Sequence, residues 1–157
     1  MKQFSSIGAF LGHLATVAAH ENVALHKGLE KCAVAVEKTA KEEIGHYQDQ
    51  VEYFPAWVSL APSTLKHHES MGVGDSPLLV TGELYSTLGH ETQGLEAAVG
   101  STSEVMVYQE VGTPEIPPRA VLGPAAIRNK ELIQKTLGKA AAQGLLYGSG
   151  ETLSSLE

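Results

Sequence analysis

The histidine-rich parts of this sequence are where metal or acid–base chemistry would first be sought, because imidazole and carboxylate groups bind metal ions and transfer protons. His67, His68 and Glu69 are consecutive, and His90 precedes Glu91. A catalytic metal needs about three ligands that converge on one ion, and adjacent histidines in a loop rarely point the same way. We favour solvated loop histidines, and a small cytoplasmic metal-dependent enzyme that uses His67, His68 and Glu69 remains the alternative.

Motifs of hydrolytic and nucleotide-dependent enzymes are missing from the sequence. It has no G-x-S-x-G, P-loop or G-x-G-x-x-G motif, and Gly72-Val73-Gly74 lacks the third glycine and the following helix. The single cysteine, Cys32, lies on an apolar helical stripe and is expected to be a buried small hydrophobic residue. We therefore predict no enzymatic activity, no catalytic residue, no metal ligand and no cofactor.

A strand, a stiff arm and a helix start are predicted in succession between residues 101 and 124. Val105–Val111 is rich in β-branched and aromatic residues and is followed by Gly112, which predicts a strand that ends there. The prolines of the segment Gly112–Arg119 withhold backbone donors, so this segment is predicted to be an extended, polyproline II-like arm. Gly123-Pro124 then predicts a helix start. The arrangement would project one element from another at a fixed angle.

Arg119 is the only arginine before the last predicted helix, and it lies between Pro118 and Ala120 on the arm. Three roles remain open for it. It is an ordinary surface residue, one half of an ion pair across an interface, or a pin against a carboxylate such as Glu110 or Glu115.

Two helices are predicted from apolar periodicity. From Ile7 to Tyr47 apolar residues recur at steps of three and four, which indicates a long helix with one apolar side, allowing a break near His20–Val23. A helix of about 40 residues would span about 60 Å, so it is either broken or reaches a neighbouring molecule. Residues Pro124–Tyr147 show a second apolar face, which Gly148 is expected to terminate.

The middle of the chain predicts a small antiparallel sheet and a long loop. Residues 78–80, 81–88, 97–99 and 105–111 form short runs separated by glycine and serine, which is typical of a meander of three to four strands. For residues 78–88 a short turn of helix that enters a strand is the alternative. Residues 53–77 follow no period and predict a loop, with one helical turn at Ser63–His68, that is available for interactions. The fold class is therefore α+β: a long N-terminal helix, a small antiparallel sheet and a C-terminal helix. Residues 1–148 are predicted to form a single domain, and residues 149–157 a flexible C-terminal tail.

Acidic residues are concentrated in the middle of the chain. The net charge is −7, and residues 51–119 carry nine acidic side chains against only Lys66 and Arg119. Binding of nucleic acid by phosphate neutralisation needs clustered Lys and Arg, so we expect no specific DNA binding. The N-terminus lacks the apolar core of a signal peptide and no long apolar run is present, so a cytoplasmic protein without a membrane segment is expected.

Short motifs over about residues 55–126 carry a resemblance to a known family. In order, they are Trp57 with Leu60, Pro62, Ser63-Thr64 and Lys66; Leu78-Leu79-x-Thr81-Gly82-Glu83-Leu84; Val99-Gly100-Ser101; Tyr108-x-Glu110-x-Gly112-Thr113; Ile116-Pro117-x-Arg119; and Gly123-Pro124-Ala125. In this order they resemble the neck and tail-completion proteins of tailed bacteriophages, small virion morphogenesis proteins that join head to tail. Tail-terminator and head-closure proteins of the same neck look alike at this level.

The resemblance implies a structural virion protein, assembled in the host cytoplasm and located in the tail or neck. It implies a homo-oligomeric ring, sixfold by analogy, that contacts adjacent neck and tail proteins and lets DNA pass without specific binding. The residues expected at interfaces are Trp57, Lys66, Gly112, Thr113, Ile116, Pro117, Pro118 and Arg119. Those expected to line the channel, where carboxylates would repel phosphate, are Glu83, Glu91, Glu96, Glu104, Glu110 and Glu115.

Overall fold

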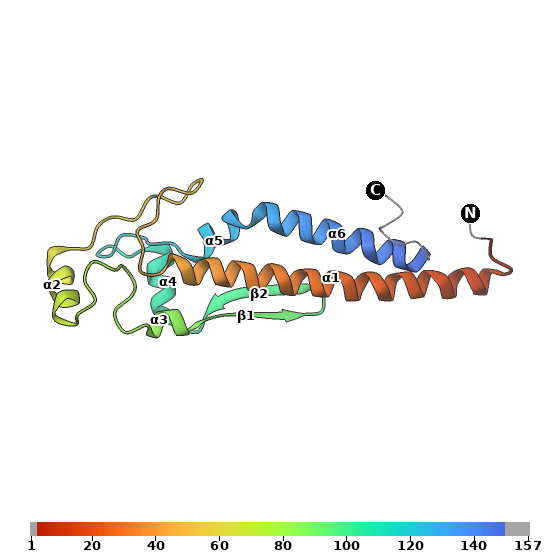
Figure 1. The fold of residues 1–157 in the computed structure, drawn as a ribbon, viewed down its shortest axis with the longest axis horizontal. Helices are drawn as coiled ribbons and strands as arrows, with labels where there is room; N and C mark the ends of the chain where they lie inside the picture. The colour runs from red at the N-terminus through yellow and green to blue at the C-terminus, as the bar shows by residue number, and fades with distance from the viewer. Residues whose placement is uncertain (1–2, 150–157) are drawn as a thin grey trace. The chain divides into compact units, whose positions relative to one another are not determined.

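A computed structural model describes residues 3–149 and shows an α+β fold with a long N-terminal helix, a two-stranded antiparallel sheet and a C-terminal helix (Figure 1). The chain forms two compact units. The first contains the residues up to Cys32, Thr92–Ala97 and the residues from Glu131 on, and the second contains Ala33–Glu91 and Ala98–Lys130. The elements are α1 (Ile7–Glu43), α2 (Pro62–Ser70), α3 (Glu83–Ser86), β1 (Leu88–Gln93), β2 (Glu96–Ser101), α4 (Glu104–Val111), α5 (Leu122–Arg128) and α6 (Lys130–Ser149).

Helix α1 is unbroken over 37 residues, so the break allowed near His20–Val23 does not occur. Ser6 starts the helix, because its hydroxyl accepts a hydrogen bond from the backbone N–H of Ala9 at 3.1 Å. Between Gly28 and Ala40 the residues at three- and four-residue spacing are buried, whereas the turns before Ala19 are largely exposed. One apolar stripe therefore supplies a core over only part of its length.

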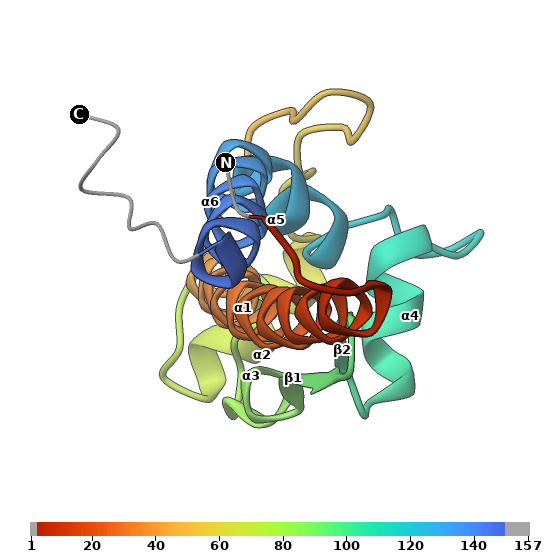
Figure 2. The ribbon, with the colours of Figure 1, turned by 90° about the vertical axis from the view of Figure 1, so that its right-hand side faces the viewer.

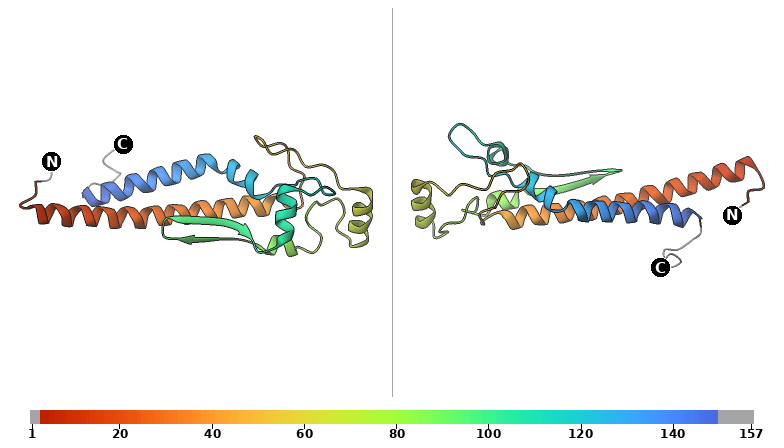
Figure 3. Two further views of the ribbon diagram at one scale, coloured as in Figure 1. Left: turned by 180° about the vertical axis from the view of Figure 1, so that it is seen from behind. Right: turned by 90° about the horizontal axis from the view of Figure 1, so that it is seen from above.

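In the first unit, α6 packs along α1 through small residues (Figure 3). A Cβ atom placed on Gly28 would lie 3.1 Å from the Cβ of Ala140, and one placed on Gly144 would lie 2.4 Å from the Cα of Glu21. The absence of side chains at these two glycines allows the helices to approach closely. The tip of the β-hairpin lies on a different side of α1 from α6 (Figure 2).

The hairpin turns through a two-residue loop, Gly94–Leu95, between β1 and β2. Gly94 has φ 58°, a left-handed conformation that glycine adopts without strain, and its carbonyl lies 2.8 Å from Nδ1 of His26 on α1. At the other end of the strand, in the second unit, His90 binds the carboxylate of Glu37 on α1, which also binds Lys41. These polar contacts hold the hairpin against the helix.

The predicted number of strands was too high, and the largest error is Val105–Val111. This segment is helix α4, which begins where the hydroxyl of Ser103 accepts from the backbone N–H of Val105 at 3.3 Å. Met106 is its only buried residue, so α4 packs on one side only. Residues 78–82 are irregular and form no strand. The short helix α3 then leads into β1 at Leu88, which agrees with the predicted alternative of a helical turn entering a strand, and the predicted run 97–99 lies in β2.

The arm Gly112–Arg119 is folded back, not extended. The backbone N–H of Thr113 donates to the carbonyl of Ile116 at 2.8 Å, and the N–H of Ile116 donates to the carbonyl of Thr113 at 3.3 Å. Residues 113–116, which precede Pro117 and Pro118, therefore form a tight turn. The three prolines of Gly112–Arg119 lower the number of backbone donors, but the N–H groups of Thr113 and Ile116 are enough to close this turn.

Three further boundaries differ from the predictions. The last helix begins at Leu122 and is divided at Asn129 into α5 and α6, and α6 continues through Gly148 to Ser149. The predicted loop 53–77 contains α2, a nine-residue helix that extends the expected helical turn. The predicted tail, apart from Ser149, lies outside the described residues.

Gly112 is expected to be sensitive to any substitution that adds a side chain. It has φ 75° and ψ 173°, and a Cβ atom there would lie 3.0 Å from the carbonyl oxygen of Ile116 and from the ring of Pro118. The substitution Gly112→Ala should lower the free energy of unfolding by about 1–3 kcal/mol, because this backbone region is nearly restricted to glycine. Urea unfolding measures the effect, and Gly100→Ala is the control, since a Cβ at Gly100 meets no atom within 4 Å. Equal effects of the two substitutions would contradict the prediction.

Candidate functional site

A single carboxylate joins α4 to the start of α5. Glu110 accepts hydrogen bonds from the backbone N–H groups of Val121 at 2.8 Å and Leu122 at 3.0 Å through Oε2, and from Gly123 at 2.8 Å through Oε1. The first N–H groups of a helix have no partner within the helix, and its N-terminus carries partial positive charge. Glu110 is therefore the N-terminal cap of α5, supplied from another helix.

A second bond fixes the residue that precedes this cap. The backbone N–H of Arg119 donates to the carbonyl of Gln109 at 2.6 Å. With Glu110 bound to residues 121–123 and Gln109 bound to Arg119, both ends of the loop between them are held. The side chain of Arg119 is thereby placed at a fixed position beside α4.

The segment opposite this loop is anchored by two aromatic residues. The indole N–H of Trp57 donates to the carbonyl of Ala120 at 3.1 Å, and Trp57 is buried. The hydroxyl of Tyr47 accepts from the backbone N–H of Leu60 at 3.0 Å and donates to Asp75 at 2.5 Å. Trp57 thus belongs to the core of the second unit and is not available to an interface.

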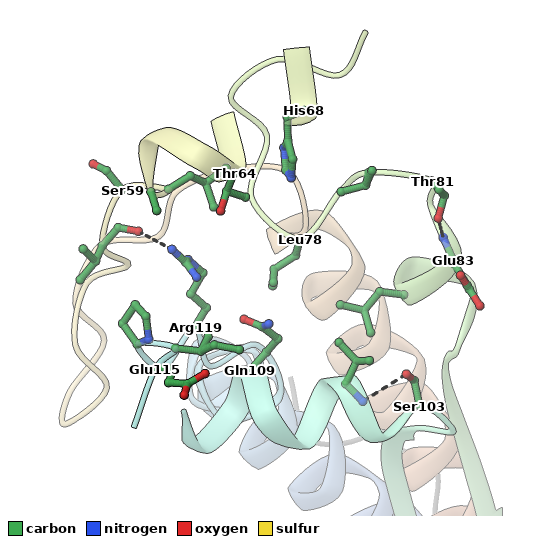
Figure 4. Close-up of a pocket in the computed structure, with 18 of the residues that line it drawn as sticks. Ser59, Thr64, His68, Leu78, Thr81, Glu83, Ser103, Gln109, Glu115 and Arg119 are labelled. Carbon is green, nitrogen blue, oxygen red and sulfur yellow. Dashed lines mark hydrogen bonds between the residues drawn. The ribbon is translucent and has the colours of Figure 1, made fainter. Parts of the chain in front are cut away.

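A cavity of about 720 Å³ lies between these segments, entirely within the second unit (Figure 4). Its walls come from residues 58–61, from α2, from residues 78–84, from α4 and from the loop that ends at Arg119. Apolar side chains such as Leu60, Leu78 and Ile116 form much of the lining. Leu78 has φ 63°, an uncommon conformation for a leucine, and such strain is often retained at sites of function.

Two of the residues that line this cavity each carry a buried polar atom without a partner. Arg119 is 6% exposed, and its Nη2 donates to the carbonyl of Val58 at 3.0 Å, but its buried Nε–H has no hydrogen-bond partner. The buried Oε1 of Gln109 also has none. No carboxylate of the described residues forms an ion pair with Arg119 within 4.0 Å, so neither Glu110 nor Glu115 is pinned by it. A buried guanidinium without a counter-ion is costly, because arginine cannot release its proton.

The other residues expected at an interface lie in the Gly112–Arg119 loop, except Lys66, which lies on α2. Thr113 caps the turn, since its hydroxyl accepts from the N–H of Ile116 at 3.0 Å. Ile116 and Pro117 are exposed and line the cavity, whereas Lys66 is exposed on α2. Pro118 packs against Gly112. The structure therefore brings Ile116, Pro117 and Arg119 together, and Lys66 is not among the cavity-lining residues.

Five of the six carboxylates expected in a channel are exposed, and the sixth, Glu110, is bound to backbone N–H groups. Glu110 is used in the cap of α5, so we no longer place it on a channel surface. The exposed ones are Glu83, Glu91, Glu96, Glu104 and Glu115.

The histidines considered as metal ligands have separate environments. His68 is buried and its Nδ1 lies 3.2 Å from the carbonyl of Gly74, whereas His67 is exposed. Within residues 3–149, no three His, Cys, Asp or Glu side chains are placed to hold one metal ion. Burial raises the pKa of the Cys32 thiol, which disfavours the reactive thiolate.

Glu43 is a buried carboxylate at the end of α1, with 2% exposure. Its Oε1 accepts from Nη1 of Arg128 at 2.7 Å, and the same Nη1 donates to Gln48 at 2.7 Å, but Oε2 is buried without a partner. Burial raises the pKa of Glu43 to about 7, against the opposing effect of Arg128. The half-satisfied carboxyl is therefore the main pH-sensitive group that we identify in this unit.

An apolar face on the first turns of α1 has no cover within the first unit. Ile7, Leu11 and Leu14 are 79%, 58% and 46% exposed, and they lie at the four- and three-residue spacing of one helical side. Residues 3–20 contain no Asp, Glu, Lys or Arg. Sequence periodicity predicted this stripe correctly but could not show that only its later part is buried.

Comparison with family models, with curated proteins and with solved structures finds no match for this chain. Among the helices of the described part, none combines the length and the apolar character needed to cross a membrane.

Replacing Glu110 should destabilise the second unit. Glu110→Gln removes the negative charge and one acceptor oxygen from three backbone N–H groups, so the free energy of unfolding should fall by about 1–3 kcal/mol. Urea unfolding at neutral pH measures this loss. Glu91→Gln, which changes an exposed carboxylate, is the matched control and should have little effect. If both variants unfold like the wild type, the cap does not contribute.

Glu43 should make stability depend on pH in a defined direction. Its pKa is about 7 when folded and 4.5 ordinarily, so the folded state binds more protons between these values, and stability is lost as pH rises from about 4.5 through 7. The loss is at most about 3 kcal/mol. The variant Glu43→Gln should lack this component of the pH profile.

Denaturant unfolding between pH 4.5 and 8 tests the prediction. Glu42→Gln is the control, because Glu42 is a highly exposed neighbour on the same helix. Parallel pH profiles for the wild type and Glu43→Gln would contradict the assignment.

Proposed function

We propose that this protein is a structural subunit that self-associates into a ring at the head–tail junction of a tailed bacteriophage, where it works by binding and not by bond chemistry. The observation that carries the self-association is the uncovered apolar face of α1. Large exposed apolar surfaces are unfavourable in water and mark places where another molecule binds. The assignment to the phage neck comes from the motif resemblance over about residues 55–126.

A second copy of the chain is the occupant that suits this face best. The face is apolar and uncharged, so another apolar surface of a neighbouring copy can cover it without burying an unpaired charge. A helix that presents apolar residues at three- and four-residue spacing can pack against another helix by interdigitation of side chains. Contacts that repeat in one direction close into a ring when the rotation permits, and a sixfold ring is proposed by analogy with the family.

The exposed carboxylates suit a ring through which DNA passes. Five exposed glutamates, from Glu83 to Glu115, remain available for a channel surface after Glu110 is assigned to its cap. Carboxylates on a channel wall would repel phosphate and keep DNA from adhering. A tail-terminator or head-closure subunit of the same neck would use these features in the same way.

Assembly should depend on the apolar face of α1 and not on the helix as a whole. Wild-type protein should form oligomers whose population rises with concentration, and Leu11→Glu should weaken association by at least about tenfold, because it buries a charge in the contact. Ala9→Glu is the matched control, since residue 9 is exposed on the opposite side of α1 and accepts the same charge. Light scattering after size exclusion measures mass, and negative-stain images show whether rings form.

Two results would contradict the proposal. One is a wild-type protein that remains monomeric at every accessible concentration and also in the presence of assembled phage necks. The other is equal loss of assembly in Leu11→Glu and Ala9→Glu, which would mean that the helix face is not the contact.

A further inference from the structure

We propose that the cavity around Arg119 is a docking site for an acidic side chain, flanked by apolar residues, that another protein chain presents. This site is separate from the self-association surface on α1, and it lies within the second unit.

The buried guanidinium defines the chemistry of the missing group. The Nε–H of Arg119 is buried and unpartnered, while Nη2 is held by the carbonyl of Val58 and the backbone N–H is held by Gln109. The side chain is therefore immobilised before any ligand arrives, so little entropy is lost on binding. A carboxylate is the natural partner, because its planar oxygens match the guanidinium and neutralise its charge.

Gln109 adds a second requirement. Gln109 lines the same cavity (Figure 4), and its buried Oε1 lacks a donor. A carboxylate cannot donate to this oxygen, but the backbone N–H groups of a peptide can. An acidic residue within a peptide chain therefore supplies both of the missing hydrogen-bonding partners.

The lining selects against anions of high charge. Glu83 and Glu115 are exposed on the same cavity, so a phosphate or a nucleic acid would meet two carboxylates beside the one cation. A single carboxylate with a neutral or basic neighbour meets less of this repulsion. The cavity is thus suited to one glutamate or aspartate and not to an acidic cluster.

The size of the apolar surface favours a protein over a small molecule. Val58, Val105 and Ile116 line the cavity yet remain 58%, 49% and 36% exposed. A small carboxylic acid inside the cavity would leave these side chains in water, whereas a chain that crosses the opening would cover them. Because we assign self-association to α1, we assign this site to a different chain, and that choice rests on the proposed function.

Peptide titration followed by NMR tests the site directly. The probes are the peptides acetyl-Leu-Glu-Leu-Lys-amide and acetyl-Leu-Gln-Leu-Lys-amide, added to wild-type protein labelled with ¹⁵N. The Glu peptide should shift the Nε–H resonance of Arg119 and the side-chain amide resonances of Gln109, and it should bind at least about tenfold more tightly than the Gln peptide.

Variants on α4 provide a matched control that leaves Arg119 in place. Val105→Asp adds a carboxylate to the cavity wall and should abolish binding of the Glu peptide. Val107→Asp adds the same charge to an exposed position of the same helix that does not line the cavity, and binding should persist. Arg119→Lys should reduce the preference for the Glu peptide, and its folding is checked by urea unfolding.

Several outcomes would overturn the proposal. Equal affinity for the two peptides, or an Arg119 resonance that does not move at millimolar peptide, would show that no carboxylate binds there. Equal binding by butyrate would replace the protein partner with a small acid. A shift that follows protein concentration without peptide would show that a second copy is the occupant. Peptide binding by a protein that never oligomerises would overturn the proposed assembly and leave this site standing.

Discussion

The three hydrogen bonds that Glu110 accepts at the start of α5 are the constraint on which the second unit depends. They hold the end of α4 to residues 121–123, and the bond from Arg119 to Gln109 holds the chain just before them. The residues between must reverse direction within a short length, which requires the positive φ of Gly112 and the turn from Thr113 to Ile116. Arg119 faces the cavity because this loop is closed.

The N-terminal and C-terminal helices were predictable, because the periodicity of their apolar residues indicates burial on one side. Helix α4 was not predicted. Its β-branched and aromatic residues suggested a strand, yet Ser103 before it and Gly112 after it were signals of helix ends. Those signals decide the structure here because α4 buries only Met106 and leaves its other apolar residues in water. A strand would have needed a neighbouring strand for its backbone groups, and residues 78–87 do not provide one.

The candidate site was predictable in part. Arg119 and the Gly112–Arg119 loop stood out because one arginine was set among prolines, and the structure places this loop beside a cavity. The contribution of Gln109 was not predictable, because an unpartnered oxygen becomes visible only when all neighbouring donors are placed. The role of Glu110 was missed for a related reason: its partners are backbone N–H groups 11 to 13 residues away, which carry no side-chain signal.

The two buried charges of the second unit show why Arg119 is better explained by binding than by folding. Glu43 has a cation, Arg128, at 2.7 Å, and its raised pKa lets it exist without charge. Arg119 is neither paired nor neutralised in this way, since it cannot lose its proton and no carboxylate of the described chain pairs with it. The loop itself is held by backbone bonds of residues 109, 119 and 121–123 and by Glu110, none of which needs the guanidinium. An apolar side chain at position 119 would avoid the desolvation cost of a charge, but it would remove the donor to the carbonyl of Val58. The carboxylate that we propose on a partner would offset the charge of arginine while this bond is kept.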